Sequence, residues 1–302
     1  MDGIIPLLKP KGMTSHDCVF KLRKILRTKR VGHTGTLDPE VTGVLPICIG
    51  RATKVAEYIT DAGKEYIGEV TLGYSTTTED AYGEVVEQKN VTTTHTREQI
   101  LSVLNSLVGE ITQIPPMFSA VKVNGKKLYE YARLGQVVER PKRQVTIYEI
   151  ELLDDREVFA GETISFSFRV KCSKGTYIRT LAVQIGELLG YPAHMSKLER
   201  TQSASFTLAN SFTLEQIAEA MENGTIDQIL YPLEEGINYL PSITVDEETE
   251  KKVLNGMRLS HSLFPKEKQL YVVFNTSGVA LAIYAPHPEK EGLYKPQKVL
   301  KV

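Results

Sequence analysis

The chain of 302 residues is 41% hydrophobic and 24% charged, which is ordinary for a globular protein and leaves room for one large domain and a small one. Its net charge is −1, and its three cysteines form no C-x-x-C pair, which argues against a disulfide framework and a cysteine-based zinc site. No apolar run approaches the roughly 18 residues that cross a membrane, and the N-terminus does not resemble a signal peptide. We therefore expect a cytoplasmic protein without membrane contact.

Charge is distributed unevenly along the chain. Six of the ten residues 21–30 are basic, and residues 116–143 hold seven basic residues against two acids. In residues 210–260 the balance reverses, with ten acids against three bases. Each basic run alone is typical of a solvated helix face, but two such runs in one part of the chain favour a polyanionic partner.

The N-terminal third of the chain predicts a mixture of helices and strands. Thr14 or Ser15 can cap a helix that runs to about Thr28, and "GHTG" breaks it. "VLPICIG" is typical of a short buried strand and "RATKVAEYITDA" of a second helix, whereas the alternation in "EYIGEVTLG" predicts a strand with one buried face. "STTTEDAYG" indicates a polar loop, and "REQILSVLNSLVG" a further helix.

The middle of the chain adds a hairpin and two strong strands. "VNGK" is a hairpin turn signal, and "KLYEYARLG" predicts a short helix that ends at Gly135. "RQVTIYEIELL" and "TISFSFRVKC" predict strands, "CSKGTYIRTLAVQIGELLG" leads into a helix, and another helix is expected near 213–222. Because strands and helices do not alternate as regular βαβ units, we expect an α+β fold around a largely antiparallel sheet.

A second, smaller domain is expected at the C-terminal end. The segment "YPLEEGINYLPSI" is typical of a joint, and after it "LYVVFN", "VALAIYA" and "KVLKV" predict short strands among many turn residues. We therefore divide the chain into a domain of residues 1–238, with a basic insertion at about 115–145, and a β-rich domain of residues 239–302.

The familiar cofactor and metal motifs are missing from the sequence. It contains neither a Walker A loop nor a G-x-G-x-x-G pattern, and its six histidines show no metal-ligand spacing. "GHTG" matches the G-x-x-G of a KH domain, but it leads into an apolar strand rather than a helix. We expect neither a metal nor a cofactor.

Asp38 stands in "GTLDP", directly before the predicted buried strand. Pro39 biases it toward extended backbone, so the carboxylate lies on a constrained loop. Taken alone, most such Asp-Pro pairs are ordinary turn residues. The basic residues upstream would favour the ionised form and lower the pKa of Asp38, which suits a nucleophile better than a general base.

Five long stretches, collinear over about residues 3–205, resemble the bacterial TruB family of tRNA pseudouridine synthases. They are "LLKPKGMTSHD", "RVGHTGTLDPEVTGVLPICIGRATK", "KEYIGEVTLGYSTTTEDAYGEV", "PPMFSAVKVNGKKLYEYARLG" and "CSKGTYIRTLAVQIGELLG". The resemblance implies a pseudouridine synthase fold, with helices flanking a mainly antiparallel mixed sheet, and a C-terminal PUA-like RNA-binding domain. It implies a monomer that needs no protein partner and isomerises the uridine at position 55 in the T loop of tRNA.

The resemblance also implies catalytic roles. Asp38 corresponds to the family's catalytic aspartate, which attacks either C6 of the uracil or C1′ of the sugar. Tyr66, in "KEYIG", corresponds to the tyrosine that stacks on the base and takes part in proton removal from C5. Arg179, in "GTYIR", corresponds to the arginine that pairs with the catalytic carboxylate. From composition alone, Tyr66 would be a core residue of a strand and Arg179 a surface residue of a helix.

Further residues are implied to contact the RNA. His33 would fill the space that the extruded base leaves, because a flat imidazole can stack and hydrogen-bond. Leu198 would pack on the uracil, and Lys9 would be a structural or phosphate-contacting residue near the pocket. In the basic segment 122–143, which corresponds to an insertion over the T stem, we expect Lys126 and Lys127 to contact phosphate.

One position departs from the family pattern, and two alternatives stay open. Gln184 stands where many relatives are expected to carry an acid, which puts only a local helix contact in doubt. The basic runs and the PUA-like tail would equally serve a chaperone that binds and remodels tRNA. A synthase that acts on another RNA is the second alternative.

Overall fold

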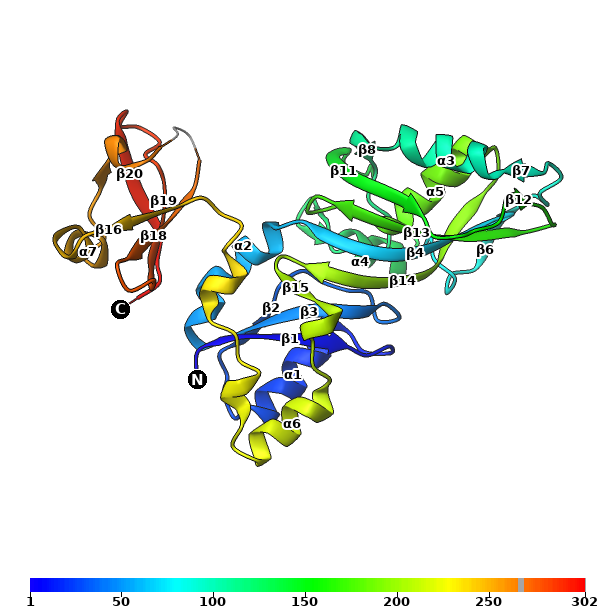
Figure 1. Cartoon of the computed structure of the whole chain (residues 1–302). Helices are drawn as coiled ribbons and strands as arrows, with labels where there is room; N and C mark the ends of the chain where they lie inside the picture. The colour runs from blue at the N-terminus through cyan, green and yellow to red at the C-terminus, as the bar shows by residue number, and fades with distance from the viewer. Residues whose placement is uncertain (266–268, 302) are drawn as a thin grey trace.

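The computed structural model describes residues 1–265 and 269–301, and its largest sheet has nine strands (Figure 1). The order is β1-β3-β14-β4-β13-β11-β8, with β2 beside β3 and β15 beside β14. Among the described strands, β14 and β3 form the one parallel pair of this sheet, so the expected α+β fold with a mainly antiparallel sheet is confirmed. The bounds are β1 Gly3–Lys9, β2 Val31–His33, β3 Thr42–Ile49, β4 Lys64–Leu72, β8 Gly109–Gln113, β11 Arg143–Leu152, β13 Ile164–Cys172, β14 Ala193–Ser203 and β15 Phe206–Thr207.

Helices pack on this sheet in two groups. α3 (Arg97–Ser106) and α5 (Ile178–Leu189) contact each other beside β11 and β14, whereas α1 (Ser15–Ile25) and α6 (Leu214–Glu222) meet near β1 (Figure 1). α5 shows why these residues form a helix, since its apolar side chains recur every three or four positions and bury one stripe against the sheet. The buried apolar side chains of that stripe are Ile178, Leu181, Ala182, Ile185 and Leu189.

Two predicted helices differ from the structure at their ends. Thr14 caps α1 as expected, in a capping box with Asp17. The helix ends at Ile25 instead of near Thr28, because Arg27 adopts a left-handed backbone with a φ of 51°. The helix expected over 51–62 is divided into a 3₁₀ helix (Gly50–Val55) and the short α2 (Ala56–Asp61).

Three short two-stranded sheets lie outside the main sheet; two of them are hairpins, and the third pairs strands that lie far apart in the sequence. The "VNGK" turn is confirmed, since Asn124 and Gly125 both have positive φ, at 50° and 83°, as a tight hairpin turn requires. The expected polar loop after β4 contributes the first strand of another hairpin. The elements are β5 Tyr74–Thr76 with β6 Val85–Gln88, β7 His95–Thr96 with β12 Val158–Phe159, and β9 Lys122–Val123 with β10 Lys126–Lys127, which α4 (Leu128–Arg133) follows.

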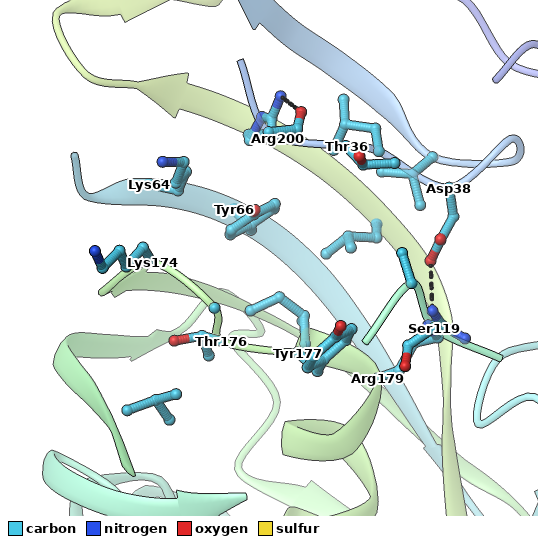
Figure 2. Close-up of a pocket in the computed structure, with 18 of the residues that line it drawn as sticks. Thr36, Asp38, Lys64, Tyr66, Ser119, Lys174, Thr176, Tyr177, Arg179 and Arg200 are labelled. Carbon is cyan, nitrogen blue, oxygen red and sulfur yellow. Dashed lines mark hydrogen bonds and ion pairs between the residues drawn. The ribbon is translucent and has the colours of Figure 1, made fainter. Parts of the chain in front are cut away.

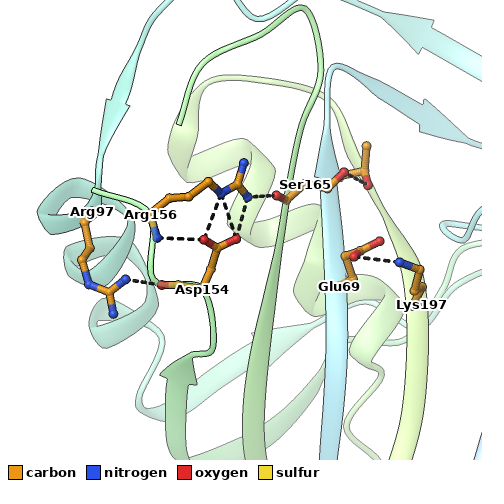
Figure 3. Close-up of polar contacts among 7 residues, drawn as sticks. Glu69, Arg97, Asp154, Arg156, Ser165 and Lys197 are labelled. Atoms are coloured by element: carbon orange, nitrogen blue, oxygen red, sulfur yellow. Dashed lines mark hydrogen bonds and ion pairs between the residues drawn. The ribbon is translucent and has the colours of Figure 1, made fainter. Parts of the chain in front are cut away.

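Polar contacts tie the loop after β11 to its neighbours (Figure 3). Arg156 forms an ion pair with Asp154 at 2.6 Å and donates to the carbonyl oxygen of Ser165 on β13 at 2.5 Å. Arg97, at the start of α3, donates to the Asp154 carbonyl. The ion pairs in this region are at least partly exposed, and such pairs contribute about 0–1 kcal/mol each, so they shape the loop more than they stabilise the fold.

The C-terminal part forms its own five-stranded sheet, in the order β16-β18-β19-β20-β17. The expected "KVLKV" strand is wrong in its position. The strand is Leu293–Val299, because it pairs with residues 282–286 of the preceding strand, and Val302 lies outside the described residues. The bounds are β16 Ser242–Val245, α7 Glu247–Leu254, β17 Leu259–Ser260, β18 Tyr271–Asn275, β19 Ala280–Pro286 and β20 Leu293–Val299.

The two sheets share an apolar junction. One cluster of buried side chains includes Ile4 and Val44 from the main sheet and Val272 and Ile283 from the small one. Polar contacts lie beside it, including a hydrogen bond from Lys54 Nζ to the Val299 carbonyl oxygen at 2.8 Å. The small sheet therefore packs on the main domain near α2 (Figure 1), while the division at residue 238 stays a prediction.

Candidate active site

A cavity of about 860 Å³ opens beside the loop between β2 and β3. The loop contributes Asp38 to its lining, β4 contributes Tyr66, and β14 contributes Leu198 and Arg200. Residues 118–120 of the insertion and residues 173–179, which run into the first turn of α5, also line it (Figure 2). These five segments, far apart in the sequence, thus meet at one pocket, whose volume is in the range of sites for small organic ligands.

Short contacts fix the loop that carries Asp38. The hydroxyl of Ser15 accepts a hydrogen bond from the Leu37 amide at 2.9 Å, and the Gly12 amide donates to the Pro39 carbonyl at 2.8 Å. Directly after the loop, a Cβ on Gly43 would lie 2.2 Å from the Arg200 carbonyl oxygen, so only glycine permits β3 to approach β14 this closely. The loop is held from both sides.

Asp38 and Arg179 form an ion pair at the cavity, with Arg179 Nη2 3.1 Å from Asp38 Oδ2 (Figure 2). Arg179 is 6% exposed, and its guanidinium also donates to the carbonyl oxygens of Thr78 and Phe118 at 3.0 Å each. The Asp38 side chain is 42% exposed. The arginine is therefore fixed by the protein, and the carboxylate that it orients remains open to a ligand.

The direction expected for the pKa of Asp38 needs correction. Desolvation raises the pKa of Asp38, the positive charge of Arg179 lowers it only in part, and the nearby Asp80 raises it further. The expected low pKa of Asp38 is therefore wrong, because the walls of the cavity remove more solvation from the carboxylate than the cations restore.

Tyr66 and Leu198 line the cavity from neighbouring strands, β4 and β14. Tyr66 is 9% exposed, and burial raises the pKa of its hydroxyl. Leu198 lies opposite Gly68 in the strand register and is half-buried. An aromatic ring and an aliphatic side chain on one wall can hold a flat base by apolar contact.

His33 lies at the end of β2, directly before the loop, and is not among the residues that line the cavity. Its Nδ1 is buried without a hydrogen-bond partner among the described residues. Burial and the positive charge of Arg200 lower the pKa of His33, which favours the neutral imidazole. Its expected role as a wedge in the RNA stays a prediction.

Lys9 is fully buried, which favours the structural alternative over phosphate contact. Its ammonium donates to the carbonyl oxygens of Pro10 at 2.8 Å, Met13 at 2.6 Å and Pro39 at 3.0 Å. These three acceptors match the three protons of the ammonium group. Lys9 therefore holds the loop from behind, one residue away from Asp38, instead of contacting substrate.

The insertion places basic and aromatic side chains beside the cavity. Lys126 is exposed and lies over the Tyr131 ring, with its ammonium 5.9 Å from the ring centroid. Lys127 lies 5.4 Å from the centroid of Tyr129, which lines the cavity. Cations beside aromatic rings at a pocket mouth are suited to nucleic-acid contact. This arrangement agrees with phosphate binding by both lysines, which stays a prediction.

Sequence analysis missed two buried cations of the cavity, Lys64 and Arg200. The sequence does hold a signal for them, because side chains two positions apart on a strand point to the same face of the sheet. Lys64 stands two positions before Tyr66 on β4, and Arg200 stands two positions after Leu198 on β14, so each shares a strand face with a residue that was singled out. Gln184 lies away from the cavity, where its amide donates to the Thr112 carbonyl at 3.0 Å.

Within residues 1–265 and 269–301, no group of three or more histidine, cysteine or carboxylate side chains is placed to hold a metal ion. In the same residues, no helix has the length and apolar character of a membrane span.

Comparison with protein families matches two models along the chain. Residues 23–178 match the N-terminal domain of the TruB family of pseudouridylate synthases. Residues 179–238 match the C-terminal domain of tRNA pseudouridylate synthase B. Among curated proteins, the tRNA pseudouridine synthase B of Bacillus cereus is 61% identical over 99% of this chain and 97% of its own length. That of Listeria welshimeri is 59% identical over 100% and 99%.

Solved structures show the same fold. A crystal structure of a Cbf5-Nop10-Gar1 complex contains a chain that matches with a TM-score of 0.76 and 29% identity, over 99% of this chain and 85% of that one. An H/ACA RNP bound to a substrate RNA containing 2′-deoxyuridine matches with a TM-score of 0.74 and 27% identity, over 99% and 85%.

Proposed function

The chain belongs to the TruB family of pseudouridylate synthases, and we propose that it converts uridine to pseudouridine in tRNA, at position 55 of the T loop. The observation that carries the proposal is the Asp38–Arg179 pair in a cavity that also holds Tyr66. Relatives that match over the full chain carry the name tRNA pseudouridine synthase B, which supports tRNA as the substrate.

In this proposal Asp38 is the nucleophile and Arg179 orients it. Attack at C6 or at C1′ lets the C1′–N1 bond break, so that the uracil can rotate and rejoin C1′ through C5. The 3.1 Å ion pair with Arg179 favours the ionised carboxylate and opposes the desolvation that raises the pKa of Asp38. Bonds are exchanged within one nucleotide, so the proposal invokes neither a metal nor a cofactor.

The depth of the site requires the target base to leave its RNA stack. Leu198 and Tyr66 would contact the uracil on the cavity wall, since both line it. A base in a folded loop reaches such a wall only after extrusion. The insertion with Lys126 and Lys127 would lie over the T arm, where phosphate contacts position the RNA without reading its sequence.

The decisive experiment is site mapping on unmodified tRNA. Wild-type protein is incubated with a tRNA transcript, and pseudouridine is mapped along the whole chain of the RNA. We expect one product, at position 55. Product elsewhere would indicate a synthase for another site, and absence of product in tRNA would contradict the proposal.

The proposal includes a monomer that works in the cytoplasm without a protein partner. Light scattering of the purified protein, alone and with tRNA, tests the first part. A one-to-one mass agrees with it, and a stable dimer would contradict it.

A further inference from the structure

Arg200 is a buried cation in the lining of the cavity. It is 1% exposed, and its guanidinium donates to the carbonyl oxygens of Val44 at 2.7 Å and Gly35 at 3.2 Å. Among the described residues it forms no ion pair. A buried charge without a counter-charge is expensive, so its presence at a cavity points to an anion that arises there in the reaction.

The strand register places Arg200 directly beside Tyr66. The two residues are partners across the β14–β4 pair, and both line the cavity. Figure 2 shows their side chains next to each other, with Asp38 and Arg179 farther along the same pocket. Directly opposed residues on one face of a sheet have Cβ atoms about 5 Å apart, so side chains of this length make contact.

The charge of Arg200 acts on the tyrosine hydroxyl. Burial raises the pKa of Tyr66, and Asp38 and Cys172 raise it further. Arg200 opposes all three, because its positive charge lowers the pKa of Tyr66. The anion that the buried guanidinium is placed to receive is therefore the phenolate of Tyr66.

Lys64 is the other buried cation of the cavity, but its ammonium is already occupied. It donates to the carbonyl oxygens of Thr60 at 2.5 Å and Ala62 at 2.6 Å, at the end of α2. Burial and the neighbouring Arg200 lower the pKa of Lys64 to about 8. A group that loses its proton this readily cannot replace the permanent charge of a guanidinium.

The reaction requires a base at this place. Uridine carries hydrogen on C5 and none on N1, whereas pseudouridine carries it on N1 and none on C5. After C5 has joined C1′, the C5–H bond must break, its electron pair forms the C5–C6 double bond, and N1 gains a proton. The phenol of Tyr66 can first give its proton to N1 once the C1′–N1 bond has broken. The resulting phenolate oxygen then takes the C5 proton, which returns the tyrosine to the neutral phenol from which it started.

We propose that Arg200 is a positioning residue for this base: it anchors the Asp38 loop through Gly35 and β3 through Val44 to β14, and it holds Tyr66 ready to act as a phenolate. The inference rests on the proposed function. It assigns the two arginines of the cavity different tasks, Arg179 to the nucleophile and Arg200 to the proton acceptor.

The first test measures the tyrosine directly and needs no activity. In protein with ¹³C-labelled tyrosine, the titration of Tyr66 is followed by NMR in wild type, Arg200→Met and Arg200→Lys. We expect a higher pKa of Tyr66 in Arg200→Met and a value nearer to wild type in Arg200→Lys, which keeps the charge. An unchanged pKa of Tyr66 in Arg200→Met would overturn the inference.

The second test follows the C5–H bond in single turnovers of tRNA with protium or deuterium at C5. We expect Arg200→Met to slow the reaction about 10- to 100-fold, which is less than the roughly 10²- to 10⁴-fold that a general base contributes, because Tyr66 itself remains in place. The deuterium isotope effect should grow and the pH profile should shift upward. Arg169→Met, an arginine on β13 outside the cavity, is the matched control and should behave as wild type. A slower Arg200→Met with an unchanged isotope effect would indicate a purely structural role.

A double-mutant cycle completes the test. If Arg200 acts through Tyr66, then Arg200→Met should add little to the loss caused by Tyr66→Phe, and full additivity would overturn the inference.

If Arg200→Met does not fold, Arg200→Gln, which keeps a hydrogen-bond donor without the charge, is measured with the same two outcomes. An inactive wild type would refute the proposed function and this inference together, whereas an active wild type with indifferent Arg200 variants refutes this inference alone.

Discussion

The cavity pairs each of two reactive side chains with a buried arginine, and the two pairs differ in their resting state. Arg179 already holds a carboxylate, Asp38, whose side chain is 42% exposed. Arg200 lies beside Tyr66, which is buried and whose raised pKa keeps it a neutral phenol at rest. One arginine stabilises a charge that is present, and the other is placed for a charge that arises only during turnover.

We expect substitution of Arg179 to cause the largest loss of rate, and to distinguish the Asp38–Arg179 pair from the Tyr66–Arg200 pair. Arg179→Met removes the group that orients Asp38 and leaves the carbonyls of Thr78 and Phe118 without their donor. We expect the single-turnover rate to fall by about 10²- to 10³-fold, as for loss of one positioned donor in an active site. Unlike Arg200→Met, it should not increase the C5 isotope effect. A larger isotope effect in Arg179→Met would remove the distinction between the two arginines.

The pH dependence of the rate and of the stability should report on the Asp38–Arg179 pair. Because the pKa of Asp38 is raised, the acidic limb of the rate profile should lie above the range of a free aspartate. The stability should change with pH in the other direction from the rate. A raised pKa means that Asp38 binds its proton more tightly in the folded state than in the unfolded state, so protonation of Asp38 stabilises the fold. Relative to Asp38→Asn, the wild type should gain stability as pH falls through the folded pKa of Asp38. Unfolding of both proteins by urea across pH measures this, and a loss in the wild type would contradict it.

We expect a smaller effect from Lys9, because it supports the Asp38 loop without contacting substrate. Lys9→Met leaves three carbonyl oxygens without their donor, which should cost about 1–3 kcal/mol of stability. We expect a lower free energy of unfolding and a slower reaction, with tRNA affinity almost unchanged. Titration with tRNA decides the point, because a large loss of affinity would restore Lys9 as a phosphate contact.

The smallest expected effect belongs to the insertion. Replacing Lys126 and Lys127 by glutamine should weaken tRNA binding and reduce the slope of log affinity against log salt by about 1 to 2. The rate at saturating tRNA should not change, since neither lysine touches the Asp38 or Tyr66 pair. An unchanged salt slope would mean that the phosphates lie elsewhere.

Periodicity and turn chemistry were sufficient for most of the fold. The Thr14 cap, the Asn124–Gly125 turn and the apolar stripe of α5 depend on local rules, and each was predicted. The end of α1 was not, because a left-handed Arg27 leaves no signal in apolar spacing. The strand Leu293–Val299 was misplaced because its register is set by the neighbouring β19, which is a tertiary constraint.

For the site, resemblance indicated Asp38, Tyr66 and Arg179, while physical reasoning alone left Asp38 a turn residue. The raised pKa of Asp38 could not be predicted, since the basic run precedes it in sequence but does not surround it in the cavity. Arg200 was missed because a charged residue in a strand is usually placed on the exposed face.

The central claim is that Asp38 begins the reaction, and release of tritium from C5-tritiated tRNA tests it most directly. Wild-type protein should release tritium as pseudouridine forms. Asp38→Asn should bind the same tRNA and release none above background. Release at the wild-type rate by Asp38→Asn would contradict the account.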